Sequence, residues 1–147
     1  MLVAFQAMET TLEQTLRNIY ASAETIAVVG ATPNPEKAGN SIPRYLQSQG
    51  YRIVPVTPSH HEVFGVRAYP SLADVDVPVD VVDVFRPAPE APGIVREAIG
   101  LGAKVVWLQL GIVSEEAAAI GEEAGLTVIM DRCMGAAHRK LGLGPRR

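Results

Sequence analysis

The chain has 147 residues, 48% of them hydrophobic and 20% charged, a balance that suits one domain with a buried core. A net charge of −3 and an aromatic content of 5% argue against a nucleic-acid-binding surface. The single cysteine, Cys133, excludes a disulfide framework and a multi-cysteine metal site, and no apolar run is long enough for a membrane span. We therefore expect one cytoplasmic domain over residues 1–147 that contacts neither nucleic acid nor membrane.

The pattern along the chain begins with a helix and continues with alternating strands and helices. Residues 1–22 are expected to form an N-terminal helix packed on the domain through an apolar stripe at Leu12, Leu16, Ile19 and Tyr20. Apolar runs predict five strands, at residues 26–30, 52–56, 79–85, 104–109 and 126–130. Ser114, followed by two glutamates, is the expected N-cap of the helix before the last strand.

This alternation predicts an α/β, Rossmann-like doubly wound sheet of about five parallel strands with helices on both faces. The expected strand order is 3-2-1-4-5, numbered along the chain, which places the strand at 79–85 on the edge beside the strand at 52–56. Pro55 cannot donate within a ladder, so we expect a bulge there or a strand that leaves the sheet. Ligands bind where strand order reverses, so the site is expected between the strands that end at Gly30 and near Gln109.

The loop after the first strand suits a phosphate. It runs from Gly30 to Ser41 and offers backbone N–H groups, the hydroxyls of Thr32 and Ser41, the positive charge of Lys37 and a helix N-terminus. A long polar loop without a ligand is the alternative interpretation. Both G-x-G-x-x-G and G-x-x-x-x-G-K-[ST] are absent, because Pro35 stands where each pattern needs a glycine, and this argues against a P-loop NTPase.

The second and third strands end in residues that suit phosphates of a nucleotide. Where NAD-binding folds carry a carboxylate, residues 57–61 read TPSHH, and the two histidines suit an additional ribose phosphate, as in NADP or CoA, unless they are merely solvated. Arg86, in the stiff turn FRP, either reaches a phosphate or pairs with Asp83 or Glu90.

Groups that would carry catalysis are scarce. The three histidines fit no Ser/His/Asp or zinc spacing, and nothing marks Asp80 and Asp83 as an acid–base pair. Cys133 is either a reactive thiol beside Arg132 or a buried inert residue, and Trp107 is expected in the core. The residues therefore predict a nucleotide crevice without visible chemistry.

Six segments in order carry a family resemblance: GATPNP (30–35), VTP (56–58), FGVRAYPSL (64–72), FRP (85–87), VWLQLG (106–111) and DRCM (131–134). Through them the chain closely resembles the small stand-alone CoA-binding proteins, relatives of the N-terminal domain of the succinyl-CoA synthetase α subunit. The resemblance implies a protein that binds CoA or acyl-CoA and is not itself an enzyme. An NADP-dependent oxidoreductase and a non-catalytic subunit of an acyl-CoA ligase remain alternative functions. The expected protein partner is either a ligase-like protein or a second copy of this chain.

The resemblance also assigns roles to four loops. The first places Thr32, Pro33 and Asn34 at the CoA phosphates, and the second brings His60, where the synthetase has a lysine, near the adenosine. The third flanks the adenine and the fourth follows the pantetheine arm, with Leu110 in place of a synthetase glutamate. The full set of expected CoA-binding residues is Gly30, Ala31, Thr32, Pro33, Asn34, Lys37, Ser41, Thr57, Pro58, His60, Phe85, Arg86, Pro87, Leu108 and Gln109.

Cys133 aligns with a cysteine-containing segment near the thiol end of CoA in the synthetase. The resemblance therefore suggests that Cys133 could approach the CoA sulfur and form a mixed disulfide.

Overall fold

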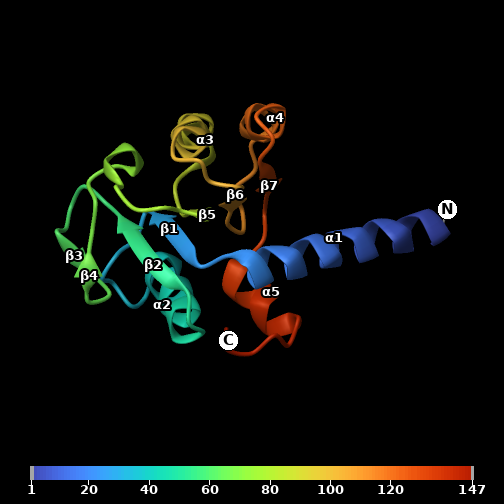
Figure 1. Cartoon of the computed structure of the whole chain (residues 1–147), viewed down its shortest axis with the longest axis horizontal. Coiled ribbons are helices and arrows are strands. Elements are labelled where there is room, and N and C mark those ends of the chain that lie inside the picture. The colour runs from blue at the N-terminus through green and yellow to red at the C-terminus, as the bar shows by residue number, and fades with distance from the viewer. Residues whose placement is uncertain (1, 147) are drawn as a thin grey trace.

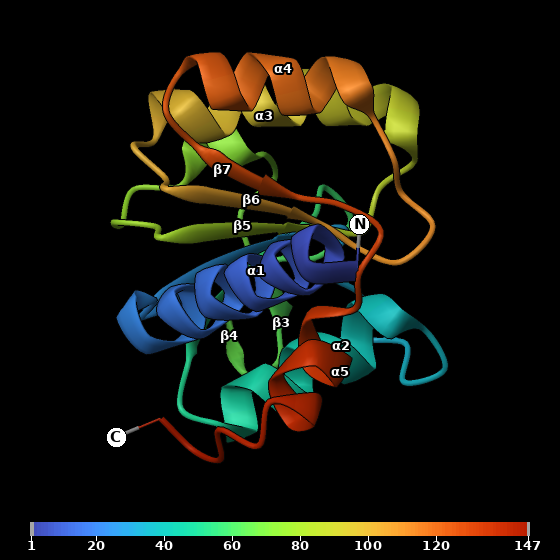
Figure 2. The same ribbon diagram turned by 90° about the vertical axis from the view of Figure 1, so that its right-hand side faces the viewer.

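A computed structural model describes the backbone of residues 2–146 and the side chains of residues 11–146. A five-stranded parallel sheet lies between two layers of helices (Figures 1 and 2). Its strands are β1 (Thr25–Val29), β2 (Arg52–Val56), β5 (Val81–Val84), β6 (Val105–Leu108) and β7 (Thr127–Ile129). One face carries α1 (Leu2–Ser22), α2 (Ala38–Ser48) and α5 (Met134–Lys140), and the other carries α3 (Ala91–Gly100) and α4 (Glu115–Glu123). The α/β Rossmann-like fold class is confirmed.

The strand order within the sheet differs from the expected one. It is β2-β1-β5-β6-β7, so the strand predicted at 79–85 lies between β1 and β6 and not on the edge beside β2. The chain between β2 and β5 has no α-helix; it contains the hairpin β3 (Glu62–Val63) and β4 (Val66–Arg67) and the 3-10 turn η1 (Leu72–Asp74). Leu72 and Val75 of this segment pack on the α3 face, opposite α2. A right-handed connection on that face leads back past β1, which reverses the strand order.

Pro55 fits the sheet because β2 is an edge strand. Its carbonyl accepts from the Tyr69 N–H at 3.0 Å on the outer side, and Thr57 N–H donates to the Tyr69 carbonyl at 2.8 Å. In a strand the N–H and C=O of one residue point the same way, so the missing donor of Pro55 falls outside the ladder with β1. The predicted bulge or departure is therefore not needed.

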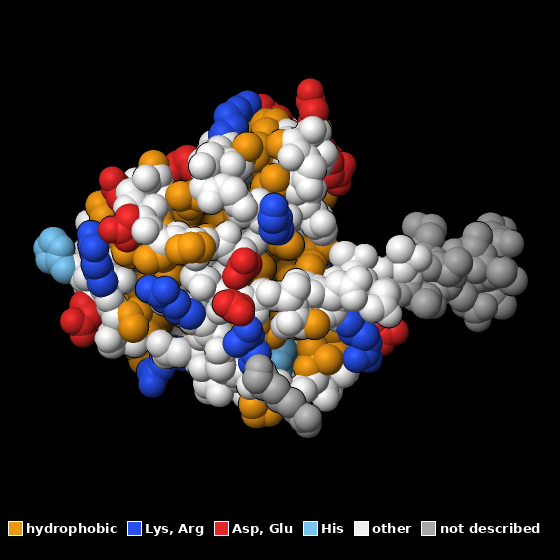
Figure 3. All heavy atoms as spheres, viewed as in Figure 1, with side chains coloured by type: hydrophobic (Ala, Val, Ile, Leu, Met, Phe, Trp, Pro, Cys, Tyr) orange, Lys and Arg blue, Asp and Glu red, His pale blue; other side chains and the backbone are white. Residues whose placement is uncertain are grey.

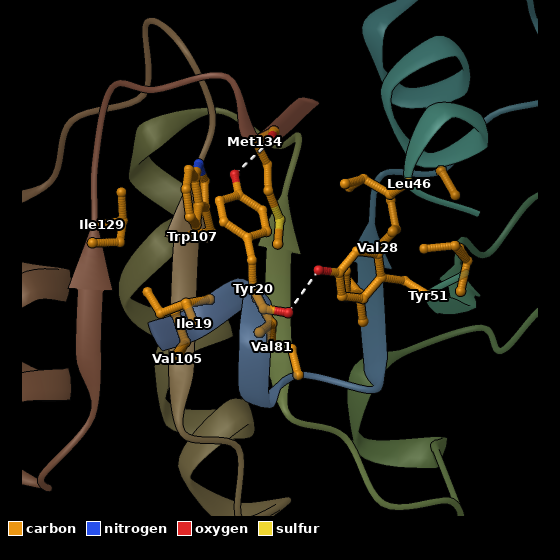
Figure 4. Close-up of a cluster of buried hydrophobic side chains, with 14 of the residues drawn as sticks. Ile19, Tyr20, Val28, Leu46, Tyr51, Val81, Val105, Trp107, Ile129 and Met134 are labelled. Atoms are coloured by element: carbon orange, nitrogen blue, oxygen red, sulfur yellow. Dashed lines mark hydrogen bonds between the residues drawn. The ribbon is translucent and has the colours of Figure 1, made fainter. Parts of the chain in front are cut away.

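The face under α1, α2 and α5 has an aromatic core (Figure 4). The Tyr20 ring lies between Trp107, at 5.8 Å between ring centroids, and Tyr51, at 6.5 Å. Its hydroxyl donates to the Met134 carbonyl at 2.6 Å, and the Tyr51 hydroxyl donates to the Tyr20 carbonyl at 2.7 Å. Trp107 is fully buried, as expected, and its indole N–H donates to the Arg132 carbonyl at 2.9 Å. The core thus holds the start of α5 against the sheet.

The structure confirms two predictions for the helices, the N-cap of α4 and the buried side of α1. Ser114 caps α4, because its hydroxyl accepts from the Ala117 N–H at 3.1 Å. Leu16, Ile19 and Tyr20 of α1 are buried in the core, while Figure 1 shows α1 extending away from the α/β body. The predicted packing of residues 1–10 lies outside the side chains that the structure describes.

The face of the molecule drawn in Figure 3 is neither mainly basic nor mainly acidic. Basic and acidic side chains of the described residues are interspersed on that face and leave no continuous basic patch there. Across residues 2–146, no helix combines the length and the apolarity needed to cross a bilayer.

Candidate ligand-binding cleft

The carboxyl ends of four strands surround a cleft of about 1020 Å³. The loops after β1, β2, β5 and β6 contribute to it, together with the start of α2 and one side of α3. In Figure 2 the loops after β1 and β6 lie at the same end of the sheet. Because β5 is the neighbour of β1, the reversal of strand order falls between Gly30 and Phe85, one strand away from the expected place beside β6.

Glycines at two positions let the backbone close the base of the cleft. Gly30 has a φ of +94°, and a Cβ there would lie 3.0 Å from the Phe85 carbonyl oxygen. Gly39, in the first turn of α2, faces the same loop, and its Cβ would lie 2.6 Å from the Gly30 carbonyl oxygen. Both approaches involve backbone atoms, so a side chain at either position would push the β1 loop and α2 apart.

The start of α2 presents unpaired amides to the cleft. Lys37 is the N-cap residue, and its side chain makes no capping hydrogen bond. The N–H groups of Ala38 and Gly39, both in the wall of the cleft, have no partner among the described residues. Free N–H groups at a helix start, with the field of the helix behind them, favour an anion. Lys37 also lines the cleft and adds a positive charge.

The remainder of this loop is held together by its own side chains. Thr32 Oγ1 accepts from the Asn34 N–H at 3.2 Å, and Asn34 Oδ1 accepts from the Glu36 N–H at 3.0 Å. The buried Asn40 donates to the Thr32 carbonyl at 2.9 Å. Asn34 therefore shapes the loop from outside the cleft, whereas Thr32 is part of the cleft wall.

Opposite α2, Arg86 is held in a two-point ion pair with Glu90. Its Nε and one terminal nitrogen lie 3.2 and 2.8 Å from the two Glu90 carboxylate oxygens, and this contact raises the pKa of the guanidinium. Both side chains are about half exposed and both line the cleft. Of the two interpretations of Arg86, the structure shows the pairing with Glu90 and places the pair within the cleft.

Below the cleft, Gln109 connects a buried carboxylate to α5. Its Nε2 donates to Asp83 Oδ1, and its Oε1 accepts from the Met134 N–H at 3.3 Å. Asp83 is fully buried in β5, and its Oδ2 has no hydrogen-bond partner. Burial raises the pKa of the Asp83 carboxyl to about 7, although the Gln109 amide opposes that shift.

The structure brings ten of the fifteen expected residues into the cleft wall: Gly30, Ala31, Thr32, Lys37, Thr57, Pro58, His60, Phe85, Arg86 and Gln109. Five do not line it: Pro33, Asn34, Ser41, Pro87 and Leu108. Leu108 is fully buried and faces the core under α3, because it alternates with Gln109 along the strand. Pro33, Asn34 and Ser41 are exposed on the outer side of the loop and of α2.

Several wall residues were missed because they belong to helices or to the irregular β2–β5 connection. Ile94 and Glu97 come from α3, Ile42 comes from α2, and Leu72 comes from η1. None of the four directly follows a predicted strand, and only the folded structure shows that these helices and this turn border the cleft.

Cys133 is half-buried in the wall of the cleft, directly before α5. Its Sγ caps that helix by accepting from the Ala136 N–H at 3.4 Å. Among the described side chains, no three His, Cys, Asp or Glu gather to hold a metal ion. The chemistry within reach of the cleft is therefore that of a thiol, a buried carboxyl and an Arg–Glu pair.

Comparison with known proteins agrees with this geometry. A family model for a CoA binding domain matches residues 24–139. The uncharacterized protein YneT of Bacillus subtilis is 38% identical over 131 residues, which are 89% of this chain and 97% of YneT. A solved hypothetical protein from Pyrococcus horikoshii is 39% identical with a TM-score of 0.85, covering 88% of this chain and 91% of that one.

A more distant relative is a much longer enzyme. Acetate–CoA ligase [ADP-forming] I of Archaeoglobus fulgidus is 25% identical over 130 residues, which are 82% of this chain and only 19% of the ligase. The family model spans most of the chain and both shorter relatives match nearly end to end, so the chain belongs to the CoA-binding domain family.

Proposed function

We propose that this protein binds CoA or an acyl-CoA in the cleft and catalyses no reaction on its own, acting in the cytoplasm as a carrier or sensor. The observation that carries the proposal is the cleft at the β1–β5 reversal, where the free amides of a helix start face the cleft in a chain of this family.

The chemistry of the walls matches the parts of CoA. Pyrophosphate suits the free amides of Ala38 and Gly39 with Lys37 beside them. The adenosine, with its 3′-phosphate, suits the space between the β2 and β5 loops, where the His60 imidazole and the Arg86 guanidinium offer N–H donors. The uncharged pantetheine arm suits the side lined by Gln109 and Leu110, which leads to Cys133.

Thermal-shift titration tests the proposal, using CoA, dephospho-CoA, NADP and NAD at equal millimolar concentrations. A ligand present at about 100 times its Kd stabilises the folded protein by about 2.7 kcal/mol, a readable change in Tm for a domain of this size. We expect CoA to raise the Tm most and dephospho-CoA less, because the latter lacks the 3′-phosphate. No shift with CoA would overturn the proposal, and a shift with NADP alone would favour an oxidoreductase.

Releasing Arg86 from Glu90 should strengthen CoA binding. Glu90→Gln removes a negative charge and frees the guanidinium, so we expect a lower Kd for CoA, by up to about fivefold for an exposed pair of this kind. Glu97→Gln is the matched control, since Glu97 also lines the cleft but its carboxylate accepts from the Ala73 N–H instead. Isothermal titration calorimetry of both variants separates release of Arg86 from loss of charge; equal gains would show that charge alone matters.

Cys133 should react with CoA disulfide faster than with other disulfides. Its thiolate attacks one sulfur, forms a protein–CoA disulfide and releases the second CoA as a thiolate, which balances the exchange without another oxidant. Intact-mass spectrometry should show one added CoA, absent in Cys133→Ser. Oxidised glutathione at the same concentration is the control, because it lacks the nucleotide that the cleft would bind. Equal rates with the two disulfides, or no adduct, would discard this role.

The second candidate function is that of a non-catalytic subunit of an acyl-CoA ligase. It is favoured by the similarity to an acetate–CoA ligase of which this chain covers only 19%. Affinity purification of the tagged chain from its own source would return stoichiometric ligase-like partners if this candidate is correct. Recovery of the chain alone or as copies of itself would favour the carrier or sensor.

A further inference from the structure

The buried carboxyl of Asp83 lies below the cleft and has no role in the proposed ligand contacts. It is 0% exposed, one oxygen accepts from Gln109, and the other has no partner among the described residues. Burying an acidic group with an unsatisfied oxygen costs free energy. A hydrophobic residue would suit the same place in β5 between Val28 and Trp107, the residues that lie opposite it on β1 and β6.

The Gln109 amide explains what a carboxylate does at this position. An amide side chain has an acceptor at one end and a donor at the other, and the two are easily exchanged by rotation. The ionised Asp83 carboxylate can only accept and the Met134 N–H can only donate, so both favour the orientation with Nε2 toward Asp83 and Oε1 toward Met134. Gln109 Oε1 is then directed at the Met134 N–H, the first amide of α5.

We propose that Asp83 is a positioning residue that fixes the orientation of the Gln109 amide, so that Gln109 holds the start of α5 and the adjacent Cys133 in the wall of the cleft. The inference deepens the proposed function and rests on it, since the wall in question is the expected thiol end of the CoA site. Tyr20 and Trp107 hold the same segment through the carbonyls of Met134 and Arg132, so the loss of Asp83 should loosen the segment without unfolding the domain.

The proposal implies a pH dependence, because a protonated Asp83 both donates and accepts and no longer reinforces the orientation that the Met134 N–H favours. Of the other titratable groups, Tyr20 on α1 interacts with Asp83, and the groups around Tyr20 are Cys133, His138, Tyr45 and Tyr51. Burial holds the pKa of the Tyr20 phenol far above its usual value and lowers the pKa of His138. Tyr20 therefore stays neutral across the range in which Asp83 titrates, whereas His138 gains its proton at lower pH and contacts Tyr45 through Nδ1.

Nuclear magnetic resonance of the unliganded, full-length chain tests the proposal directly. We expect the side-chain amide protons of Gln109 and the backbone amide of Met134 to shift together, with a common midpoint near pH 7. Protection of the Met134 amide from hydrogen exchange should be greatest above that midpoint. In Asp83→Asn the titration should disappear and the protection at pH 8 should fall about fivefold, the loss expected for one hydrogen bond.

Asp80→Asn is the matched control, because Asp80 accepts from the Glu24 and Thr25 N–H groups ahead of β1, away from α5. It should leave the Met134 titration intact. The proposal is overturned if the Gln109 amide protons do not titrate in the wild-type chain, if Asp83→Asn retains the Met134 protection, or if Asp80→Asn produces the same loss. The wild-type titration answers the question even if a variant fails to fold.

A separate CoA titration keeps the two proposals distinguishable. At pH 8 we expect Asp83→Asn to bind CoA about fivefold more weakly than the wild-type chain. This is the effect expected when one hydrogen bond that orders the wall of the cleft is lost. If wild-type protein does not bind CoA, the proposed function fails, while the amide coupling is still measured in the unliganded protein. If CoA binds both proteins equally although the coupling is lost, the role of Asp83 in the site is overturned.

Discussion

Gly39→Ala is expected to lower the free energy of unfolding by about 1–3 kcal/mol and to abolish most of the affinity for CoA. The new Cβ would lie 2.6 Å from the Gly30 carbonyl oxygen, and because both atoms belong to backbone, the start of α2 must move away from the β1 loop. That movement opens the cradle of free amides on which the proposed phosphate contact depends. Urea denaturation and calorimetric CoA titration measure the two effects.

Gly93→Ala is expected to have the opposite effect on the free energy of unfolding, at a comparable position in another helix. Gly93 lies in the first turn of α3, and a Cβ there would meet nothing within 4 Å. Alanine is a better helix former than glycine, so this variant should be more stable by up to about 1 kcal/mol. If both glycine variants gain stability, the close approach of α2 to Gly30 is not a constraint on this fold.

Asp83→Asn is expected to change how stability depends on pH. Because the pKa of Asp83 is raised to about 7 in the folded protein, the folded state retains a proton that the unfolded state releases above about pH 4. The contribution of Asp83 therefore makes the protein less stable as the pH rises to 7, by about 4 kcal/mol in total, and it is constant above that pH. Asparagine cannot ionise, so the variant should gain about 3 kcal/mol relative to the wild-type chain between pH 5 and pH 8.

The measurement is the difference between the two unfolding free energies at each pH, which cancels groups common to both proteins. His138 is one such group, since its lowered pKa makes the fold less stable as pH falls and would mask the Asp83 trend in either protein alone. Asp80→Asn should instead lose stability, because it replaces the charged acceptor of two backbone N–H groups with a neutral and weaker one. A flat difference curve for Asp83→Asn would contradict the raised pKa.

The elements were predictable from the sequence, but their arrangement was only partly so. Strand β5 reads as an apolar run and is buried throughout, yet nothing in the segment between β2 and β5 signals which face of the sheet that connection crosses. An amphipathic helix there would have shown an apolar side; a hairpin and a 3-10 turn do not. The strand order, and with it the neighbour of Gly30, could therefore not be deduced from periodicity.

The candidate site shows the same division between local and long-range information. Ten expected residues lie in the cleft, because loops at the carboxyl ends of parallel strands converge whatever their order. Leu108 does not line the cleft, because strand alternation turns its side chain away from that of Gln109 and into the core. The role of Asp83 depends on a contact with Gln109, 26 positions further along the chain, and single-sequence reasoning has no signal for such a pair. Whether the ten wall residues contact CoA stays a prediction.

The outer edge of β2 bears on how copies of this chain could assemble. An exposed edge strand is a template on which a second sheet can continue, but Pro55 has no N–H to offer there, and Tyr69 already occupies the carbonyl of Pro55 and the N–H of Thr57. The opposite edge, β7, is only three residues long. Neither border of the five-stranded sheet therefore favours strand exchange or edge-to-edge aggregation, and a homo-oligomer of this protein would use surfaces other than these two edges.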